Sequence, residues 1–138
     1  MREGARLDGL GGGYFIEPTV FADVSPSMCI AREEIFGPVA AVIPFQDEEE
    51  AASIANDTIY GLAAAVWTND IKRALRLARR VKSGTVWINT YQVLSPTAPF
   101  GGYKQSGLGR ELGMQALEAY LETKTVICDM NDRPMTLF

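Results

Sequence analysis

Short apolar runs alternate with amphipathic segments along the middle of this sequence. Continuous apolar runs at residues 39–45 and 62–67, and a β-branched and aromatic run at residues 85–89, are typical of interior strands. Two segments with helix signals separate these runs. The resulting order of strand, helix, strand, helix and strand predicts an α/β fold whose parallel sheet is built from consecutive βαβ units.

The two intervening helices have recognisable first residues. Asp47 is expected to cap the first helix, because Glu50 follows three residues later with the spacing of a capping box. Asn69 or Asp70 is expected to cap the second helix. The apolar residues of that helix recur on one face, at Ile71, Ala74, Leu75, Ala78 and Val81.

Charged residues gather on both of these helices. We interpret the acidic run at residues 47–50 as the favourable first turn of a helix rather than a metal site. We interpret the basic residues of the second helix as a solvated face, since a nucleic-acid site favours a basic domain with interleaved aromatic residues. These basic residues are Lys72, Arg73, Arg76, Arg79, Arg80 and Lys82.

The ends of the chain differ from its middle, and together they predict a single partial domain. Residues 1–13 are polar and glycine-rich, which predicts a mobile lead-in. The α/β portion is expected over residues 14–124, with an edge strand at 14–21, a short helix near 28–33 and an amphipathic helix at 110–122. Residues 125–138 then form a terminal strand and a polar tail.

The bulk composition is that of an ordinary globular protein. The chain has 138 residues, 47% of them apolar and 22% charged, and its formal net charge is −4. This charge gives no reason to expect nucleic acid or a membrane surface as a partner. No apolar run reaches the length of a membrane helix, and residues 1–13 have no apolar core of a signal peptide. We therefore expect a cytoplasmic protein.

The sequence contains no histidine and two cysteines, which limits the chemistry it can carry. Without histidine there is no Ser-His-Asp or Cys-His catalysis and no ordinary zinc site. Cys29 is expected to be a small buried hydrophobe between Met28 and Ile30, and Cys128 is expected to be structural. The sequence therefore assigns no catalytic residue and no metal ligand.

A long loop follows the last interior strand and is the first place to look for a site. Residues 91–109 combine two prolines and several glycines with aromatic side chains, which favours an ordered loop over disorder. Open parallel sheets bind ligands beyond the carboxyl ends of their strands, and this loop begins at such an end. The simplest structural interpretation of Phe100 is core packing beneath this loop.

Two separated motifs resemble the C-terminal part of the NAD(P)-dependent aldehyde dehydrogenase superfamily. One is AREEIFGPV at residues 31–39, and the other is TVWINTY at 85–91 followed by PFGGYKQSGLGRELG at 99–113. The resemblance implies that Glu34 accepts hydrogen bonds from the nicotinamide ribose and that Phe36 packs near the nicotinamide. A carboxylate suits a vicinal diol, and an aromatic wall restricts a planar ring.

The same resemblance implies a substrate site in the long loop. Tyr91, Leu94 and Phe100 become candidates for the wall of an aldehyde tunnel, with Leu94 standing where many members carry an aromatic residue. The cofactor would be NAD or NADP, held by only part of its site, and the substrate would be an aldehyde oxidised to a carboxylic acid.

The resemblance also implies that the reactive groups of the family are not among these residues. The family's nucleophilic cysteine, general-base glutamate and glycine-bearing cofactor domain do not match any motif in these residues, so the chain alone is expected to be inactive. A terminal strand from Thr125 to Cys128 without a neighbouring partner indicates a homo-oligomer or association with a missing N-terminal half. The alternative is a stand-alone assembly or binding module. A hydrolase built on Cys29 is disfavoured, because no histidine activates the thiol.

Overall fold

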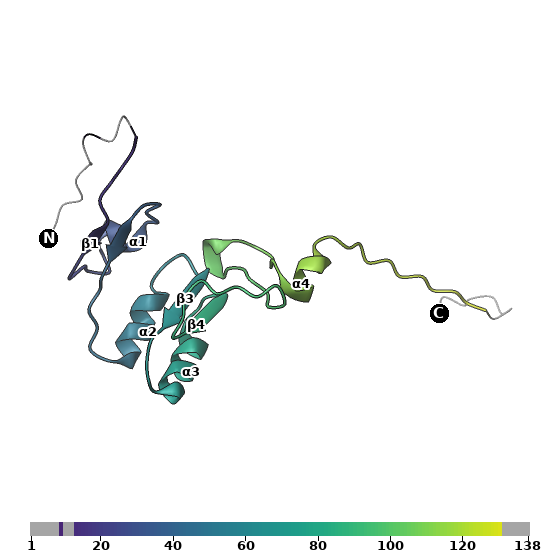
Figure 1. The fold of residues 1–138 in the computed structure, drawn as a ribbon. Coiled ribbons are helices and arrows are strands. Elements are labelled where there is room, and N and C mark those ends of the chain that lie inside the picture. Colours follow the sequence, from purple (N-terminus) through teal and green to yellow (C-terminus); the bar gives the residue numbers. More distant parts are fainter. Residues whose placement is uncertain (1–8, 10–12, 131–138) are drawn as a thin grey trace.

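The computed structural model describes Gly9 and residues 13–130 of the chain. The elements run in the order β1 (Thr19–Phe21), α1 (Cys29–Arg32), β2 (Val39–Ala41), α2 (Glu48–Asn56), β3 (Ala63–Val66), α3 (Ile71–Arg80), β4 (Thr85–Ile88), the 3₁₀ helix η1 (Lys104–Ser106) and α4 (Gly113–Glu118) (Figure 1).

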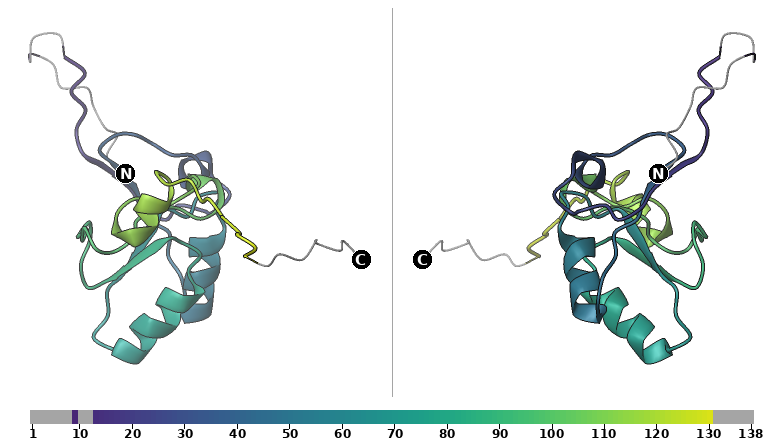
Figure 2. Two further views of the ribbon diagram at one scale, coloured as in Figure 1. Left: turned by 90° about the vertical axis from the view of Figure 1, so that its right-hand side faces the viewer. Right: turned by 90° about the vertical axis from the view of Figure 1, so that its left-hand side faces the viewer.

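The strands form two separate parallel pairs, each joined by a helical crossover. β1 pairs with β2, with Thr19 opposite Val39, and β3 pairs with β4, with Ala63 opposite Thr85. The chain therefore contains the units β1–α1–β2 and β3–α3–β4, which confirms the α/β class and the parallel βαβ architecture. α2 connects the two units, and α2 and α3 lie beside the β3–β4 pair in Figure 1 and Figure 2.

The pairing differs from the predicted single sheet in one respect. The apolar run at 39–45 was expected to neighbour the run at 62–67, but β2 pairs with β1 instead. The backbone N–H of Thr19 donates to Pro38 O at 2.8 Å, and that of Val42 donates to Phe21 O at 2.8 Å. The short β1 limits the paired part of this run to three residues, so Val42 and Phe45 are exposed.

The caps of both long helices form as predicted. The Asp47 carboxylate accepts from Glu50 N at 2.9 Å, while the Glu50 carboxylate accepts from Gln46 N at 2.6 Å, one residue before the N-cap. Asp70 rather than Asn69 caps α3, accepting from the backbone N–H groups of residues 72 and 73. The backbone N–H of Arg73 is the main cause of the lowered pKa of Asp70.

Ion pairs join the acidic start of α2 to the basic face of α3. Arg76 binds Glu48 through two hydrogen bonds of 3.0 and 2.9 Å, and Arg80 binds Glu49. The hydrogen bond from Arg76 is the main cause of the lowered pKa of Glu48. Among the described residues no group of three or more His, Cys, Asp or Glu side chains could hold a metal ion. The acidic first turn of α2 and the basic face of α3 therefore form ion pairs with each other.

Glu48→Gln is expected to weaken the chain's stability near neutral pH and to flatten its loss on acidification. Because the pKa of Glu48 is lowered from its ordinary value of 4.5, its contribution is present above that value and is lost as pH falls through the folded-state pKa. Urea unfolding midpoints between about pH 7 and pH 3 measure this difference. Glu118→Gln is the matched control, and equal pH profiles for the two variants would contradict the assignment.

The C-terminal part departs most from the prediction. α4 covers only Gly113–Glu118 rather than 110–122, because Glu111 pairs with Phe100 and both Leu112 and Gly113 have a φ of 59°. The residues from Thr125 to Cys128 form no strand with any described residue, and Val126 and Ile127 are 81% and 89% exposed. An extended segment becomes a strand only with a ladder partner, and here it runs away from the other elements (Figure 1).

The predicted ends of the chain lie mostly outside the described residues. The lead-in at 1–13 contributes only Gly9 and Gly13 to the description, and the tail beyond residue 130 contributes nothing. Within the described part, no helix is both long and apolar enough to cross a membrane.

The apolar core of the described residues is very small. Val24, Ala52 and Ala74 are its buried apolar side chains, while large side chains such as Trp67 stay exposed. The accessible surface of the chain is 11733 Å², whereas a folded monomer of this mass is expected to expose about 7,100 Å². This excess, together with the exposed large apolar side chains, suits contact with further polypeptide.

Candidate functional site

Glu34 and Phe36 stand on the short connection between α1 and β2. α1 ends where Glu33 N donates to Cys29 O at 2.9 Å, and Gly37 N donates to Ile35 O at 3.0 Å to form a tight turn. The carboxylate of Glu34 is exposed and makes no hydrogen bond or ion pair with the described residues. The ring of Phe36 is 95% exposed. Both side chains are therefore accessible to a ligand.

Tyr91 and Leu94 lie just beyond the carboxyl end of β4, as predicted. The turn after β4 is held by Asn89, whose side chain accepts from Thr68 N at 2.8 Å and donates to Thr68 O at 2.9 Å. The ring of Tyr91 meets that of Trp87 edge to face, with centroids 5.3 Å apart. Both Tyr91 and Leu94 are exposed, so they form a surface rather than an enclosed tunnel.

Phe100 lies in a different environment from Tyr91 and Leu94. Its backbone exchanges two hydrogen bonds of 2.7 Å with Glu111, and its ring is half-buried. It lines a cavity of about 560 Å³ between the loop and α4, together with residues that include Leu62, Leu112 and Tyr120. The ring is thus partly packed beneath the loop, which was the structural alternative for this residue.

No direct interaction among the described residues links all five predicted site residues. Tyr91 and Leu94 share one stretch of loop, and Glu34 and Phe36 share another. No hydrogen bond, ion pair or ring contact among the described residues joins either group to Phe100. The convergence of all five residues on one site stays a prediction.

The motif at residues 99–107 is fixed against the turn before β3, a role that the sequence did not reveal. Tyr103 N donates to Gly61 O at 2.8 Å, and the hydroxyl of Ser106 accepts from Gly61 N at 2.9 Å. A Cβ added to Gly84 would lie 1.6 Å from Gly101 O, so the loop backbone passes directly over residue 84. Only the folded chain shows why a residue without a Cβ is needed at Gly84.

The two cysteines are not placed as predicted. Cys29 is exposed rather than buried, because α1 is a single turn without any buried residue. A hydrogen bond with Glu33 is the main cause of its raised pKa, which favours the unreactive thiol over the thiolate. Cys128 is also exposed, and its Sγ lies 3.6 Å from Met130 Sδ. The neighbour of Cys29 is thus a carboxylate rather than the cation that would activate a nucleophile.

Comparison with known proteins places these features in a family. The model of the aldehyde dehydrogenase family matches residues 2–126. This chain therefore belongs to the aldehyde dehydrogenase family, which is an oxidoreductase family, as its motifs indicated.

Relatives of known sequence agree with this assignment. The chain is 58% identical over 120 residues to an aldehyde dehydrogenase of Emericella nidulans, covering 87% of this chain and 24% of that protein. It is 55% identical over 125 residues to a betaine aldehyde dehydrogenase of Brucella anthropi, covering 91% of this chain and 26% of that protein. The chain thus spans about a quarter of the length of these relatives.

Solved structures share the fold. A betaine aldehyde dehydrogenase of Staphylococcus aureus in complex with NAD⁺ is 50% identical and matches with a TM-score of 0.88, over 91% of this chain and 25% of that one. An aldehyde dehydrogenase of Mycobacterium tuberculosis complexed with NAD⁺ is 49% identical, with a TM-score of 0.85 over 94% of this chain and 26% of that one. The two βαβ units are therefore arranged as in these larger proteins.

Proposed function

We propose that this chain is the C-terminal portion of an NAD(P)-dependent aldehyde dehydrogenase. It supplies a nicotinamide-ribose contact and part of a substrate wall, while the reactive groups lie in other sequence. This proposal rests on the turn after α1, where a carboxylate with no partner among the described residues and an almost fully exposed ring stand two residues apart. Membership of the aldehyde dehydrogenase family supports it.

The chemistry of Glu34 and Phe36 fits the nicotinamide half of NAD or NADP. A carboxylate without an internal partner can accept hydrogen bonds from both hydroxyls of a ribose. An exposed aromatic ring can restrict the position of a planar heterocycle. When it is bound, NAD(P) supplies the hydride acceptor for aldehyde oxidation. NAD⁺ complexes of the relatives from Staphylococcus aureus and Mycobacterium tuberculosis agree with this fit.

The substrate wall is assigned to the loop after β4. Tyr91 and Leu94 follow the carboxyl end of β4, the end at which such sheets bind ligands, whereas Phe100 lies near the amino ends of β3 and β4, beside Leu62. Leu94 is aliphatic, so it presents a smaller and more flexible surface than an aromatic side chain would. The substrate of this wall is an aldehyde, oxidised to the carboxylic acid.

The purified 138-residue chain is expected to show no turnover of aldehydes with NAD⁺ or NADP⁺. Its thiols are exposed, and the raised pKa of Cys29 disfavours the thiolate that would attack a carbonyl. The measurement is formation of reduced cofactor, with Cys29→Ala as the comparison. Turnover by the chain that is lost in Cys29→Ala would contradict the assignment of the nucleophile to other sequence.

A second candidate function is a stand-alone assembly or binding module. The very small core and the exposed apolar faces favour it, because such surfaces suit association with another chain. In either function, we propose that residues 14–124 form the α/β portion of the chain. The segment from Thr125 to Cys128 then pairs with a second copy or with an N-terminal half. Under the module hypothesis, joining the chain to a dehydrogenase remainder produces no aldehyde oxidation.

A further inference from the structure

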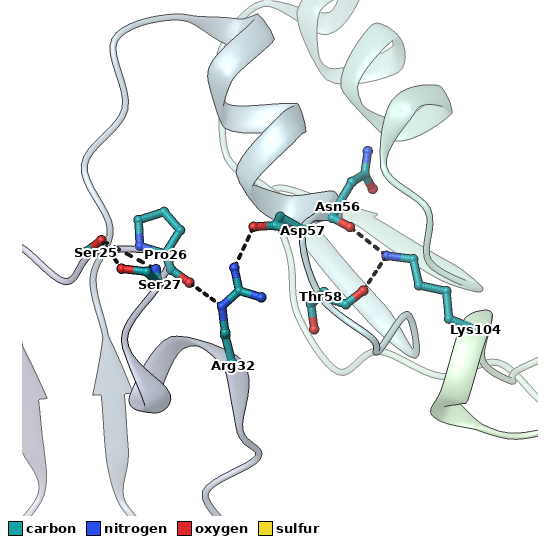
Figure 3. A network of polar contacts seen from close by, with 8 residues as sticks. All are labelled: Ser25, Pro26, Ser27, Arg32, Asn56, Asp57, Thr58 and Lys104. Atoms are coloured by element: carbon teal, nitrogen blue, oxygen red, sulfur yellow. Dashed lines mark hydrogen bonds and ion pairs between the residues drawn. The ribbon is translucent and has the colours of Figure 1, made fainter.

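The two loops with proposed site residues are both tied to the end of one helix. Arg32, the last residue of α1, lies two positions before Glu34, and Lys104, the first residue of η1, lies four positions after Phe100. Both cations reach the turn that ends α2, at residues 56–58 (Figure 3). The loops are far apart in sequence, but their anchoring cations meet the same turn.

Lys104 caps the end of α2. Its Nζ donates to Asn56 O at 2.9 Å and to Thr58 O at 3.0 Å, on either side of Asp57. A helix leaves its last carbonyl groups without internal partners and carries negative charge at that end, so an ammonium group is favoured there. Lys104 therefore fixes the backbone on both sides of Asp57.

Arg32 binds the residue between these two carbonyl groups. Its guanidinium donates to Asp57 Oδ2 at 3.2 Å, and its Nε donates to Pro26 O at 2.9 Å. The side chains of Arg32 and Asp57 are 52% and 57% exposed, so this pair contributes little to overall stability. Its geometric effect is to hold the end of α1 against α2.

The α2 turn is itself firmly placed. The Asn56 side chain donates to Arg80 O at 2.9 Å and accepts from Lys82 N at 2.7 Å. These bonds join the end of α2 to the end of α3 and to the approach to β4. The turn at residues 56–58 is thus bonded to the end of α3 and to the approach to β4. The same turn also binds Arg32 and Lys104.

We propose that residues 56–58 form a shared anchor that sets the loop of Glu34 and Phe36 relative to the loop of Phe100. In this arrangement Arg32, Asp57 and Lys104 are positioning residues, and loosening one cation from the turn loosens the loop held by the other. The link between loops follows from the contacts in this chain. Its consequence for cofactor and aldehyde rests on the proposed function.

The test is backbone amide hydrogen exchange in the 138-residue chain carrying Lys104→Met. This variant keeps the aliphatic stem and removes the charge. We expect roughly five-fold or greater acceleration at Tyr103 and Gln105, beside the substitution, and roughly two- to five-fold acceleration at Glu33 and Gly37, across the anchor. Unchanged exchange at Glu33 and Gly37 would overturn the proposal.

Two further variants complete the design. Glu49→Ala removes an exposed ion pair of α2 that contacts neither loop, and it should leave all four amides unchanged. Asp57→Ala should accelerate exchange at Glu33 and Gly37 while the β3–β4 amides stay protected. This variant tests the anchor even if Lys104→Met unfolds the chain. Unchanged exchange at Glu33 and Gly37 in Asp57→Ala would also overturn the anchor.

The functional consequence has its own measurement. In a complete dehydrogenase that carries this chain, Lys104→Met is expected to raise the KM for cofactor and the KM for aldehyde together, while Glu49→Ala changes neither. If the exchange results hold but neither KM moves, the shared anchor stands and its link to the proposed function fails.

Discussion

Gly84→Ala is expected to detach the loop at residues 99–107 from the rest of the chain. The added Cβ would lie 1.6 Å from the oxygen and 2.7 Å from the carbonyl carbon of Gly101. Both atoms belong to backbone, so no change of rotamer relieves the clash. We expect a loss of about 3 kcal/mol in the free energy of unfolding, because overpacking against backbone forces the chain to move.

Two measurements report the effect of Gly84→Ala. The urea unfolding midpoint reports overall stability, and hydrogen exchange at Tyr103, whose N–H donates to Gly61 O, reports loop docking. Gly37→Ala is the matched control, since its Cβ would meet only Ile35 Cγ2, at 3.9 Å. An unchanged midpoint and unchanged Tyr103 exchange in Gly84→Ala would show that the loop is not packed against residue 84.

Local signals in the sequence predicted the individual elements well. Asp47 and Asp70 cap their helices because an N-cap side chain bonds backbone groups only two or three residues away. The strands at 62–67 and 85–89 were found within one or two residues of β3 and β4 for a similar reason. Their short apolar runs have clear boundaries, and the helix between them requires a parallel crossover.

Non-local pairing was not predictable to the same extent. Nothing in the apolar run at 39–45 distinguishes β1 from β3 as its neighbour, because either would satisfy the same backbone groups. The terminal strand is a related case, and its pairing with another chain stays a prediction. The segment from Thr125 to Cys128 has strand-like residues, but no described residue offers it a ladder.

The sequence nominated candidate site residues, and the structure shows the surroundings of each of them. Glu34 and Phe36 were assigned from a motif, and the structure adds that both are exposed and that Glu34 has no partner in the part of the chain that it describes. The burial predicted for Cys29 was wrong, since the apolar neighbours in sequence do not form a packed face when α1 is a single turn. The close approach of Gly84 and Gly101 gave no signal, because the two residues are distant in sequence.

The second large effect concerns Glu34 in a working enzyme. A chimera is made in which this chain replaces the matching quarter of the betaine aldehyde dehydrogenase of Brucella anthropi, to which it is 55% identical. We expect this chimera to oxidise aldehydes with NAD⁺, since the remainder then supplies the reactive groups. Glu34→Gln in the chimera should lower kcat/KM for NAD⁺ by roughly 10- to 100-fold, the effect of losing hydrogen bonds to a charged group.

The central claim is tested most directly by comparing Glu34→Gln with Glu33→Gln in this chimera. Glu33 is the adjacent carboxylate. It already forms a hydrogen bond with the thiol of Cys29, so we assign it no contact with the cofactor. The account predicts a large loss of kcat/KM for NAD⁺ in Glu34→Gln and little change in Glu33→Gln. An inactive but folded chimera, or equal effects of the two substitutions, would contradict it.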